Sequence, residues 1–255
     1  MSKTKRLIFS LILVAACVLL VIVGSILFEE KNSAFISVGF VIIALVIMFL
    51  SFEQKEKTSI YISLVATLTA FSVVGRIIFS VIPGFKPVAA ITILTGVYLG
   101  YQAGFLCGSL SAVISNFYFG QGGWTPFQML GWGLIGLFAG LLARYLKKTW
   151  AMAIFSAICG LFFSITMEVW NVIFVDNYFN FARFYLTFGL ALPSTAEYAI
   201  SNVIFIVLLN KPFGSVLKRI TTKYQKKKKN LLWKIRRDFL FLNYWAAEVA
   251  SAVVE

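Results

Sequence analysis

Seven long runs of apolar residues, separated by short polar segments, account for most of the chain. The runs cover residues 7–28, 34–52, 59–82, 88–117, 126–143, 150–175 and 190–210. A helix needs about 20 apolar residues to cross the hydrocarbon core of a bilayer, and most of the runs reach that length. Backbone groups in lipid must be paired within the segment itself, which a helix achieves. The pattern therefore predicts an all-α, polytopic helical membrane protein.

The run at residues 88–117 is interrupted by the sequence Gly-Tyr-Gln-Ala-Gly at 100–104. Its first part, 88–99, would cover only about 18 Å as a helix and cannot cross a bilayer alone. We expect it to pack against its neighbours or to re-enter the membrane. With this part as a separate helix, both termini lie on one side, together with most of the 23 Lys and Arg residues. By the positive-inside rule, we expect that side to be the cytoplasmic face of the cell membrane.

Composition narrows the classes of function. The sequence is 60% hydrophobic and 13% charged, whereas a soluble domain carries about 25% charged residues. It contains no histidine, and its three cysteines lie inside apolar runs, so we expect no metal site. A Walker A sequence is absent as well, so the chain is not expected to hydrolyse ATP itself.

The net charge of +13 is concentrated on the expected cytoplasmic side, above all in the segment at residues 211–255. Four consecutive lysines at 226–229 are followed by aromatic and basic residues. A polybasic segment beside a membrane is attracted by anionic lipid, at about 1 kcal/mol per basic residue. We therefore predict a basic, aromatic cytoplasmic tail that contacts anionic lipid, and we do not expect it to bind nucleic acid.

The segment at residues 118–129 is the strongest candidate for a binding site. It places three glycines, a proline, four aromatic residues and two glutamines between two apolar runs. Such an irregular backbone cannot lie bare in lipid, because its amide groups would be unpaired. Aromatic faces beside amide groups suit an uncharged or zwitterionic ligand that contains a ring. In the expected orientation this segment lies on the outer face, together with the loops at 83–87 and 176–183, and we predict an outward-facing pocket there.

Three ionisable residues, Arg76, Glu168 and Glu197, lie within apolar runs. Each is six or seven residues from the outer end of its run, which places all three about 10 Å below the outer surface. Charges at that depth are usually paired or functional. One interpretation is an ion pair of Arg76 with Glu168 or Glu197, and the other is a polar floor to the outward pocket. Asn171 follows Glu168 by three residues and is expected to share its face.

Ala66 and Ala70 form a small-xxx-small pattern, the spacing that lets a second helix approach closely in a membrane. The pattern fits ordinary packing within the chain and also fits a contact with another subunit. The glycines between residues 131 and 140 form a second such face, for which we expect ordinary packing.

The segment from about residue 58 to residue 210 resembles the substrate-binding S components of energy-coupling-factor (ECF) vitamin transporters. The matching motifs are Ala66-Thr-Leu-Thr-Ala-Phe-Ser-Val-Val-Gly-Arg76, Phe85-Lys-Pro87 with Gly96 and Gly100, Gly104-Phe-Leu-Cys-Gly108, Ser115-Asn116, Gly120-Gln-Gly122 and Trp124-Thr-Pro-Phe-Gln-Met129. The last of these strings is specific, whereas the alanine pattern alone is not.

The resemblance implies a six-helix S-component module at 58–210, preceded by a two-helix membrane hairpin at 1–57. It also implies that the protein is not an enzyme and has no cofactor, and that it carries a vitamin as cargo. Such a module docks on a membrane coupling protein attached to two cytoplasmic ATPase subunits. By position, Ala66 and Ala70 match the alanines that meet the coupling protein.

The resemblance places the substrate site among the outer loops and outer helix ends. The expected substrate-binding residues, including the ionisable residues and Asn171 described above, are Arg76, Lys86, Asn116, Tyr118, Gln121, Trp124, Gln128, Glu168, Asn171 and Glu197. The Trp-Thr-Pro string resembles most closely the members linked to cobalamin or related corrinoids, and riboflavin is the alternative vitamin. Outside this family, the alternatives are an intramembrane enzyme acting on a lipid-linked substrate and a purely structural membrane partner.

Overall fold

A computed structural model describes residues 59–176 and 179–254 of the chain, together with residues 8, 11, 12, 15, 16 and 19. Those six residues of the first apolar run are helical. The remainder of the predicted hairpin at 1–57 lies outside the described residues.

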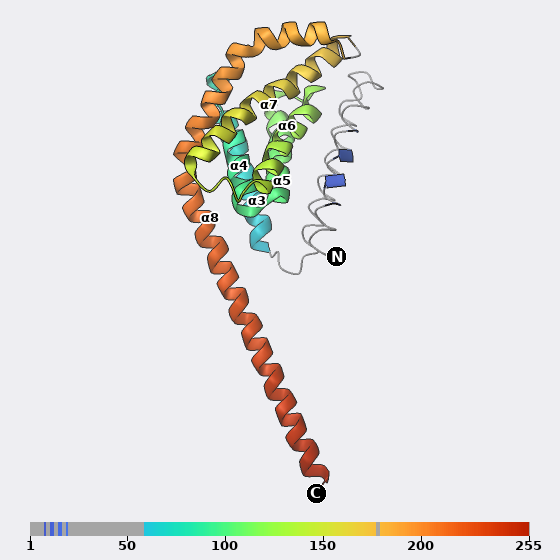
Figure 1. Cartoon of the computed structure of the whole chain (residues 1–255), viewed down its shortest axis with the longest axis vertical. Helices are drawn as coiled ribbons and strands as arrows, with labels where there is room; N and C mark the ends of the chain where they lie inside the picture. Colours follow the sequence, from blue (N-terminus) through green and yellow to red (C-terminus); the bar gives the residue numbers. More distant parts are fainter. Residues whose placement is uncertain are drawn as a thin grey trace. The chain divides into compact units, whose positions relative to one another are not determined.

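Every described element is a helix (Figure 1). In chain order they are α3 (Ser59–Ile78), the 3-10 helix η2 (Phe79–Val81), α4 (Val88–Leu99), α5 (Tyr101–Phe119), α6 (Trp124–Leu141), α7 (Thr149–Asp176) and α8 (Phe181–Val254). By its contacts the chain divides into two compact units, Met1–Lys211 and Pro212–Glu255. Among the described residues, three stretches are long and apolar enough to cross a membrane: Tyr61–Val81, Thr149–Asp176 and Phe181–Ile220. The prediction of an all-α membrane protein is confirmed.

Helix α4 lies at the centre of the bundle. It has only 12 residues, and every residue from Val88 to Gly96 is buried. It packs against α5 and α6 and, less extensively, against α3 and α7. A helix that is apolar on all sides is expected to be enclosed by protein. The prediction that this short helix packs against its neighbours is confirmed.

Glycines bring the backbones of α4, α5 and α6 into direct contact. A Cβ atom added to Gly104 would overlap the backbone of Gly136, and one added to Gly96 would overlap the same carbonyl. A Cβ atom on Gly108 would overlap the backbone of Trp132. Small residues at helix interfaces permit this close approach where lipid supplies no hydrophobic drive for association. The glycine-rich face of α6 is thus used for packing within the chain, as predicted.

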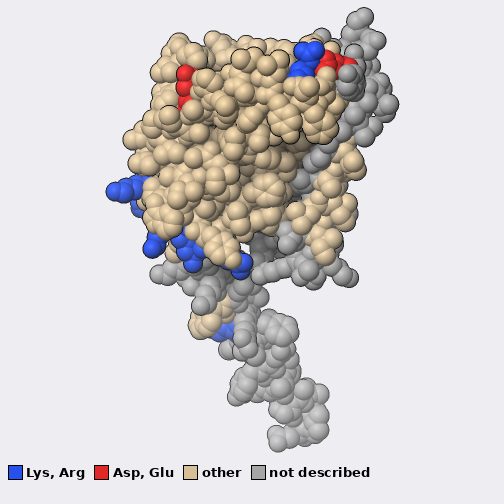
Figure 2. All heavy atoms as spheres, turned by 45° about the horizontal axis from the view of Figure 1, so that its top comes forward, with Lys and Arg blue, Asp and Glu red and all other residues tan. Residues whose placement is uncertain are grey.

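Hydrogen bonds join the helices at the end of the bundle where α6 meets α7. Asn210 of α8 donates from Nδ2 to Thr149 Oγ1 (2.8 Å) and accepts at Oδ1 from the Tyr98 hydroxyl (2.9 Å). The Tyr61 hydroxyl donates to the carbonyl oxygen of Leu99 (3.4 Å). On the face that Figure 2 shows, most Lys and Arg side chains gather toward one end of the described surface, and Asp and Glu toward the other. The predicted orientation of the chain in a membrane stays a prediction.

Helix α8 does not run straight through the bundle. In Figure 1 its first part crosses the top of the view, and the helix then turns down along the other helices. Pro193 lies in this first part of the helix. A proline has no N–H to donate to the carbonyl four residues earlier, and it clashes with that carbonyl, so it bends a helix. A bend of α8 is therefore expected at Pro193.

Candidate functional site

The connection between α3 and α4 forms one wall of the candidate site. The amide of Phe85 donates to the carbonyl of Ile82 (3.2 Å), and Gly84 between them has a φ of +67°. That left-handed conformation is readily available only to glycine. The turn places Pro87 against Gly75, where a Cβ atom would overlap the proline ring. The chain therefore returns directly into α4 beside the last turn of α3, which carries Arg76.

Arg76 is buried, with 7% of its surface exposed. Its Nη1 donates to Ser115 Oγ (2.5 Å) and to Asn116 Oδ1 (2.8 Å), both on α5. The guanidinium carbon lies 4.6 Å from the ring centroid of Phe119 and 4.9 Å from that of Trp132. Aromatic faces attract a cation through the ring quadrupole. Neutral acceptors and two aromatic rings thus surround this charge.

Asn116 connects Arg76 to the candidate binding loop. Its Nδ2 donates to Thr125 Oγ1 and to Gln128 Oε1, each at 2.9 Å. The Thr125 hydroxyl also accepts from the amide of Gly122 (3.3 Å). Asn116 and Thr125 are fully buried, and buried polar groups are normally hydrogen-bonded in this way. The network fixes the loop at 120–123 to both α5 and α6.

The aromatic residues of the loop divide between exposed and packed positions. Tyr118 is 66% exposed and lies edge-on to Phe119, with centroids 5.0 Å apart. Trp124 is half-buried at the start of α6, and its ring lies edge-on to Trp170 of α7 at 5.8 Å. Gln121 is exposed, and its Nε2 donates to the Val113 carbonyl (2.9 Å). Aromatic surface therefore remains available at the rim of the network.

Lys86 contacts Tyr198, which in turn is hydrogen-bonded to Trp132. The backbone amide of Lys86 donates to Ser201 Oγ on α8 (3.0 Å), and its Nζ lies 5.8 Å from the ring centroid of Tyr198. The Tyr198 hydroxyl accepts from Trp132 Nε1 (2.9 Å). Burial, and secondarily the charge of Arg76, lowers the pKa of Lys86 from 10.5 to about 8. Both effects disfavour a charged ammonium group.

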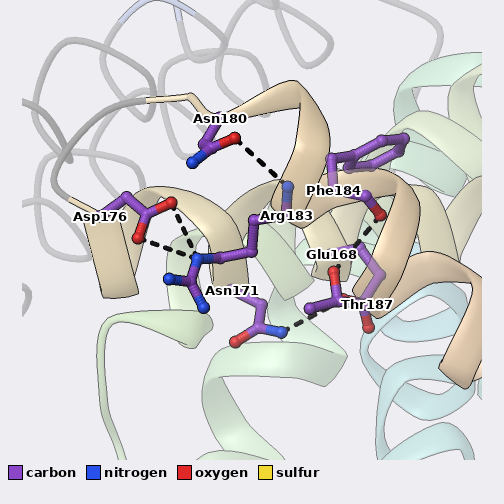
Figure 3. Close-up of polar contacts among 7 residues, drawn as sticks. All are labelled: Glu168, Asn171, Asp176, Asn180, Arg183, Phe184 and Thr187. Carbon is purple, nitrogen blue, oxygen red and sulfur yellow. Dashed lines mark hydrogen bonds and ion pairs between the residues drawn. The ribbon is translucent and has the colours of Figure 1, made fainter.

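The junction of α7 and α8 contributes a separate polar group, shown in Figure 3. Arg183 Nε lies 2.8 Å from both carboxylate oxygens of Asp176, and the Arg183 amide donates to Asn180 Oδ1 (3.2 Å). Asn171 Nδ2 donates to Glu168 Oε2 (3.2 Å). Glu168 and Asn171 therefore share a face of α7, and their place in a binding pocket stays a prediction.

The predicted ion pair of Arg76 with Glu168 or Glu197 is wrong. Among the described residues, the ion pair found is Arg183 with Asp176. The Arg76 guanidinium faces α5, whereas Glu197 is exposed beside Gly84, which lies in the connection between α3 and α4. The apolar runs indicated a common depth for the three charges, but depth alone does not determine the face of a helix from which a side chain projects.

The predicted site residues thus fall into three sets. Arg76, Asn116 and Gln128 form one hydrogen-bonded network, and Lys86 lies near it. Tyr118, Gln121 and Trp124 lie at the rim. Glu168, Asn171 and Glu197 lie on α7 and α8 outside the network. Four residues of the site were not predicted: Ser115, Thr125, Trp132 and Tyr198. The first two are adjacent to predicted residues or motifs, but the contact between Trp132 and Tyr198 joins residues far apart in the sequence.

Ala66 and Ala70 lie on the exposed surface of α3. They line an apolar groove of about 340 Å³ between α3 and α5. Its other walls include Tyr61, Ile62, Leu106 and Leu110. Contact of these alanines with another subunit stays a prediction.

A comparison with known families agrees with the helical membrane architecture. A family model described as ECF-type riboflavin transporter, S component, matches residues 57–219, which is more than half of the chain. No curated protein and no solved structure matches the sequence. The chain belongs to the family of S components of ECF-type riboflavin transporters.

Proposed function

We propose that this protein is the substrate-capture subunit of an ATP-driven vitamin importer and that its cargo is a flavin. Members of this family are membrane transport subunits and not enzymes. The observation that carries the proposal is the loop at 120–123, which is held by the buried Asn116 network and presents Tyr118 and Trp124 at its rim. A rigid loop with aromatic faces suits a flat ring system, because pre-organised groups lose less entropy on binding.

A flavin has more support than a corrinoid. The family is named for riboflavin. The expectation of cobalamin drew on amide groups that could surround a large ligand, but Asn116 and Gln128 hydrogen-bond to one another within the bundle. Gln121 also uses its amide nitrogen, on the Val113 carbonyl. A corrinoid remains the second candidate because of the Trp-Thr-Pro string, and a direct binding comparison separates the two.

The groove at Ala66 and Ala70 is the proposed docking surface for the membrane coupling protein. It is apolar, exposed and lined by small residues on α3, which permits close contact with a second helix. ATP hydrolysis would then belong to two cytoplasmic partner subunits. The same proposal places both termini on the cytoplasmic side and the basic tail against anionic lipid.

The test uses the purified full-length protein. The absorbance spectrum of co-purified small molecules distinguishes a flavin from a corrinoid, and titration with riboflavin and with cobalamin measures each affinity. We expect riboflavin to bind with one-to-one stoichiometry. Trp124→Ala should weaken binding about tenfold or more, since an aromatic stacking partner contributes about 1–3 kcal/mol per ring in analogous base-stacking sites.

Trp150→Ala is the matched control. Trp150 is 63% exposed at the start of α7, at the other end of the bundle from the loop, and its removal should leave the affinity unchanged. Binding of cobalamin but not of riboflavin would show that the cargo is a corrinoid and not a flavin. Failure to bind any vitamin would contradict the transport function, and equal losses in both tryptophan variants would remove the loop as the site.

A further inference from the structure

The connection between α6 and α7, residues 142–148, carries three basic side chains and no acidic one. The side chains of Arg144, Lys147 and Lys148 are all exposed. Leu146 lies between them and is buried, with 5% of its surface exposed. Its amide donates to the carbonyl of Leu142 (3.1 Å), which closes one turn of the connection. The buried leucine therefore fixes the connection to the bundle, and the three cations remain on the surface.

A fourth cation, Lys211 of α8, joins the same end of the bundle. The hydrogen bond from Asn210 Nδ2 to Thr149 Oγ1 (2.8 Å) places Lys211 and Lys148 beside each other, since each lies one residue from this bond. Lys211 is exposed and belongs to the same compact unit as the connection. The four side chains Arg144, Lys147, Lys148 and Lys211 form the basic patch. No carboxylate of the described residues forms an ion pair with any of the four, so their mutual repulsion favours an anionic ligand.

Apolar and aromatic surface adjoins the basic patch. Leu141 and Leu142 at the end of α6 are 37% and 39% exposed. Tyr145 is 61% exposed, and the guanidinium carbon of Arg144 lies 4.5 Å from the centroid of its ring. A candidate membrane span begins at Thr149, directly after the connection. Tyrosine and basic residues are enriched where spanning helices meet the lipid headgroups. The charges and the leucines together therefore suit a ligand with an anionic head and apolar chains.

We propose that the basic patch binds the headgroup of an anionic phospholipid, with the acyl chains against Leu141 and Leu142. The planar guanidinium of Arg144 binds two phosphate oxygens at once, while the lysine ammonium groups act as point charges. Clusters of basic residues at the ends of membrane helices bind anionic headgroups in this way. An acidic surface of a partner protein would match the charge but would not need the exposed leucines. The site involves neither the cargo nor the segment at 212–255, so it goes beyond the proposed function.

The experiment measures lipid binding by the delipidated full-length protein in an uncharged detergent. Phosphatidylglycerol and the zwitterionic phosphatidylethanolamine are titrated in, and native mass spectrometry gives the dissociation constant of the tightest bound lipid. We expect phosphatidylglycerol to bind more tightly. Lys147→Gln combined with Lys148→Gln should weaken its binding about thirtyfold, because each basic residue at a membrane surface contributes about fivefold. Lys147→Arg combined with Lys148→Arg should retain the affinity. Lys226→Gln combined with Lys227→Gln removes the same charge from the basic tail, is the matched control, and should leave the tightest bound lipid unchanged.

Four results would overturn the lipid site. Equal affinity for the two lipids would show that the net charge of the headgroup is not recognised. Equal losses in the two glutamine pairs would assign the binding to the tail. Competition by glycerophosphoglycerol, the same headgroup without acyl chains, would make the patch a site for a soluble phosphate ester. If Lys147→Gln with Lys148→Gln keeps the lipid affinity but lowers uptake by the whole transporter, the patch serves an acidic protein surface instead. Because lipid binding is measured without a vitamin, failure of the flavin proposal would leave this result unaffected.

Discussion

Removing the Asn116 side chain should destabilise the protein far more than removing any exposed amide of the same loop. In Asn116→Ala, the Arg76 guanidinium loses one of its two acceptors, and Thr125 and Gln128 each lose a donor. Hydrogen bonds between membrane helices contribute about 0.6 kcal/mol on average, and a bond to a charged group contributes about 1.5–3 kcal/mol. Two amide bonds and one guanidinium bond therefore predict a loss of about 3–4 kcal/mol in the free energy of unfolding.

The assay is equilibrium unfolding in mixed detergent micelles, followed by tryptophan fluorescence. The matched control is Gln121→Ala, which removes one bond of an exposed side chain to the Val113 carbonyl. It should cost no more than about 1 kcal/mol. If Asn116→Ala and Gln121→Ala have the same free energy of unfolding, Arg76 does not depend on the network for its burial, and the reasoning about the loop anchor is wrong.

Three further predictions concern packing, docking and titration. Gly104→Ala should prevent recovery of folded, monodisperse protein because its Cβ would overlap the Gly136 backbone, whereas Gly189→Ala, with open space around the added atom, should be recovered at the wild-type level. Ala66→Leu combined with Ala70→Leu should abolish vitamin uptake in cells that express the whole transporter, but it should leave the affinity for the vitamin unchanged. Thr67 is exposed on the same helix outside the groove, so Thr67→Leu should retain uptake. The pKa of Lys86 is lowered from 10.5 to about 8 on folding. Between these two pH values the Lys86 side chain of the unfolded chain holds a proton that the folded protein has lost. The free energy of unfolding should therefore rise with pH in this range. Tyrosine titration affects the wild type and Lys86→Gln alike, so the difference between the two proteins gives the contribution of Lys86. Equal pH dependence of unfolding in both proteins would contradict the lowered pKa of Lys86.

Much of the fold was predictable because apolar length and charge asymmetry are strong constraints in a membrane. The run at 88–117 had to be divided at Gly100 for the charges to agree with one orientation, and α4 and α5 are separated at that residue. The role of Ala66 and Ala70 in contacting another subunit stays a prediction. Apolar length and charge asymmetry depend on position along a helix axis, which the sequence encodes directly.

The partners of the charged residues were less predictable because they depend on rotation about each helix axis. Arg76 and Glu197 seemed well placed for an ion pair, yet Arg76 projects toward Ser115 and Asn116 on α5. The pair of Trp132 and Tyr198 joins α6 to α8 across 66 positions of sequence. No local pattern marks such a contact, since either residue alone fits an ordinary apolar helix.

The glycine contacts among α4, α5 and α6 have a mechanical consequence. Side chains between helices can change rotamer and let the helices slide, but backbone atoms in direct contact have no such internal degrees of freedom. Gly96, Gly104 and Gly136 bring the three helices into direct backbone contact, and we expect the helices to behave as one rigid block. Relative movement of the described helices is then confined to what surrounds this block: α3, α7, α8 and the connections between helices.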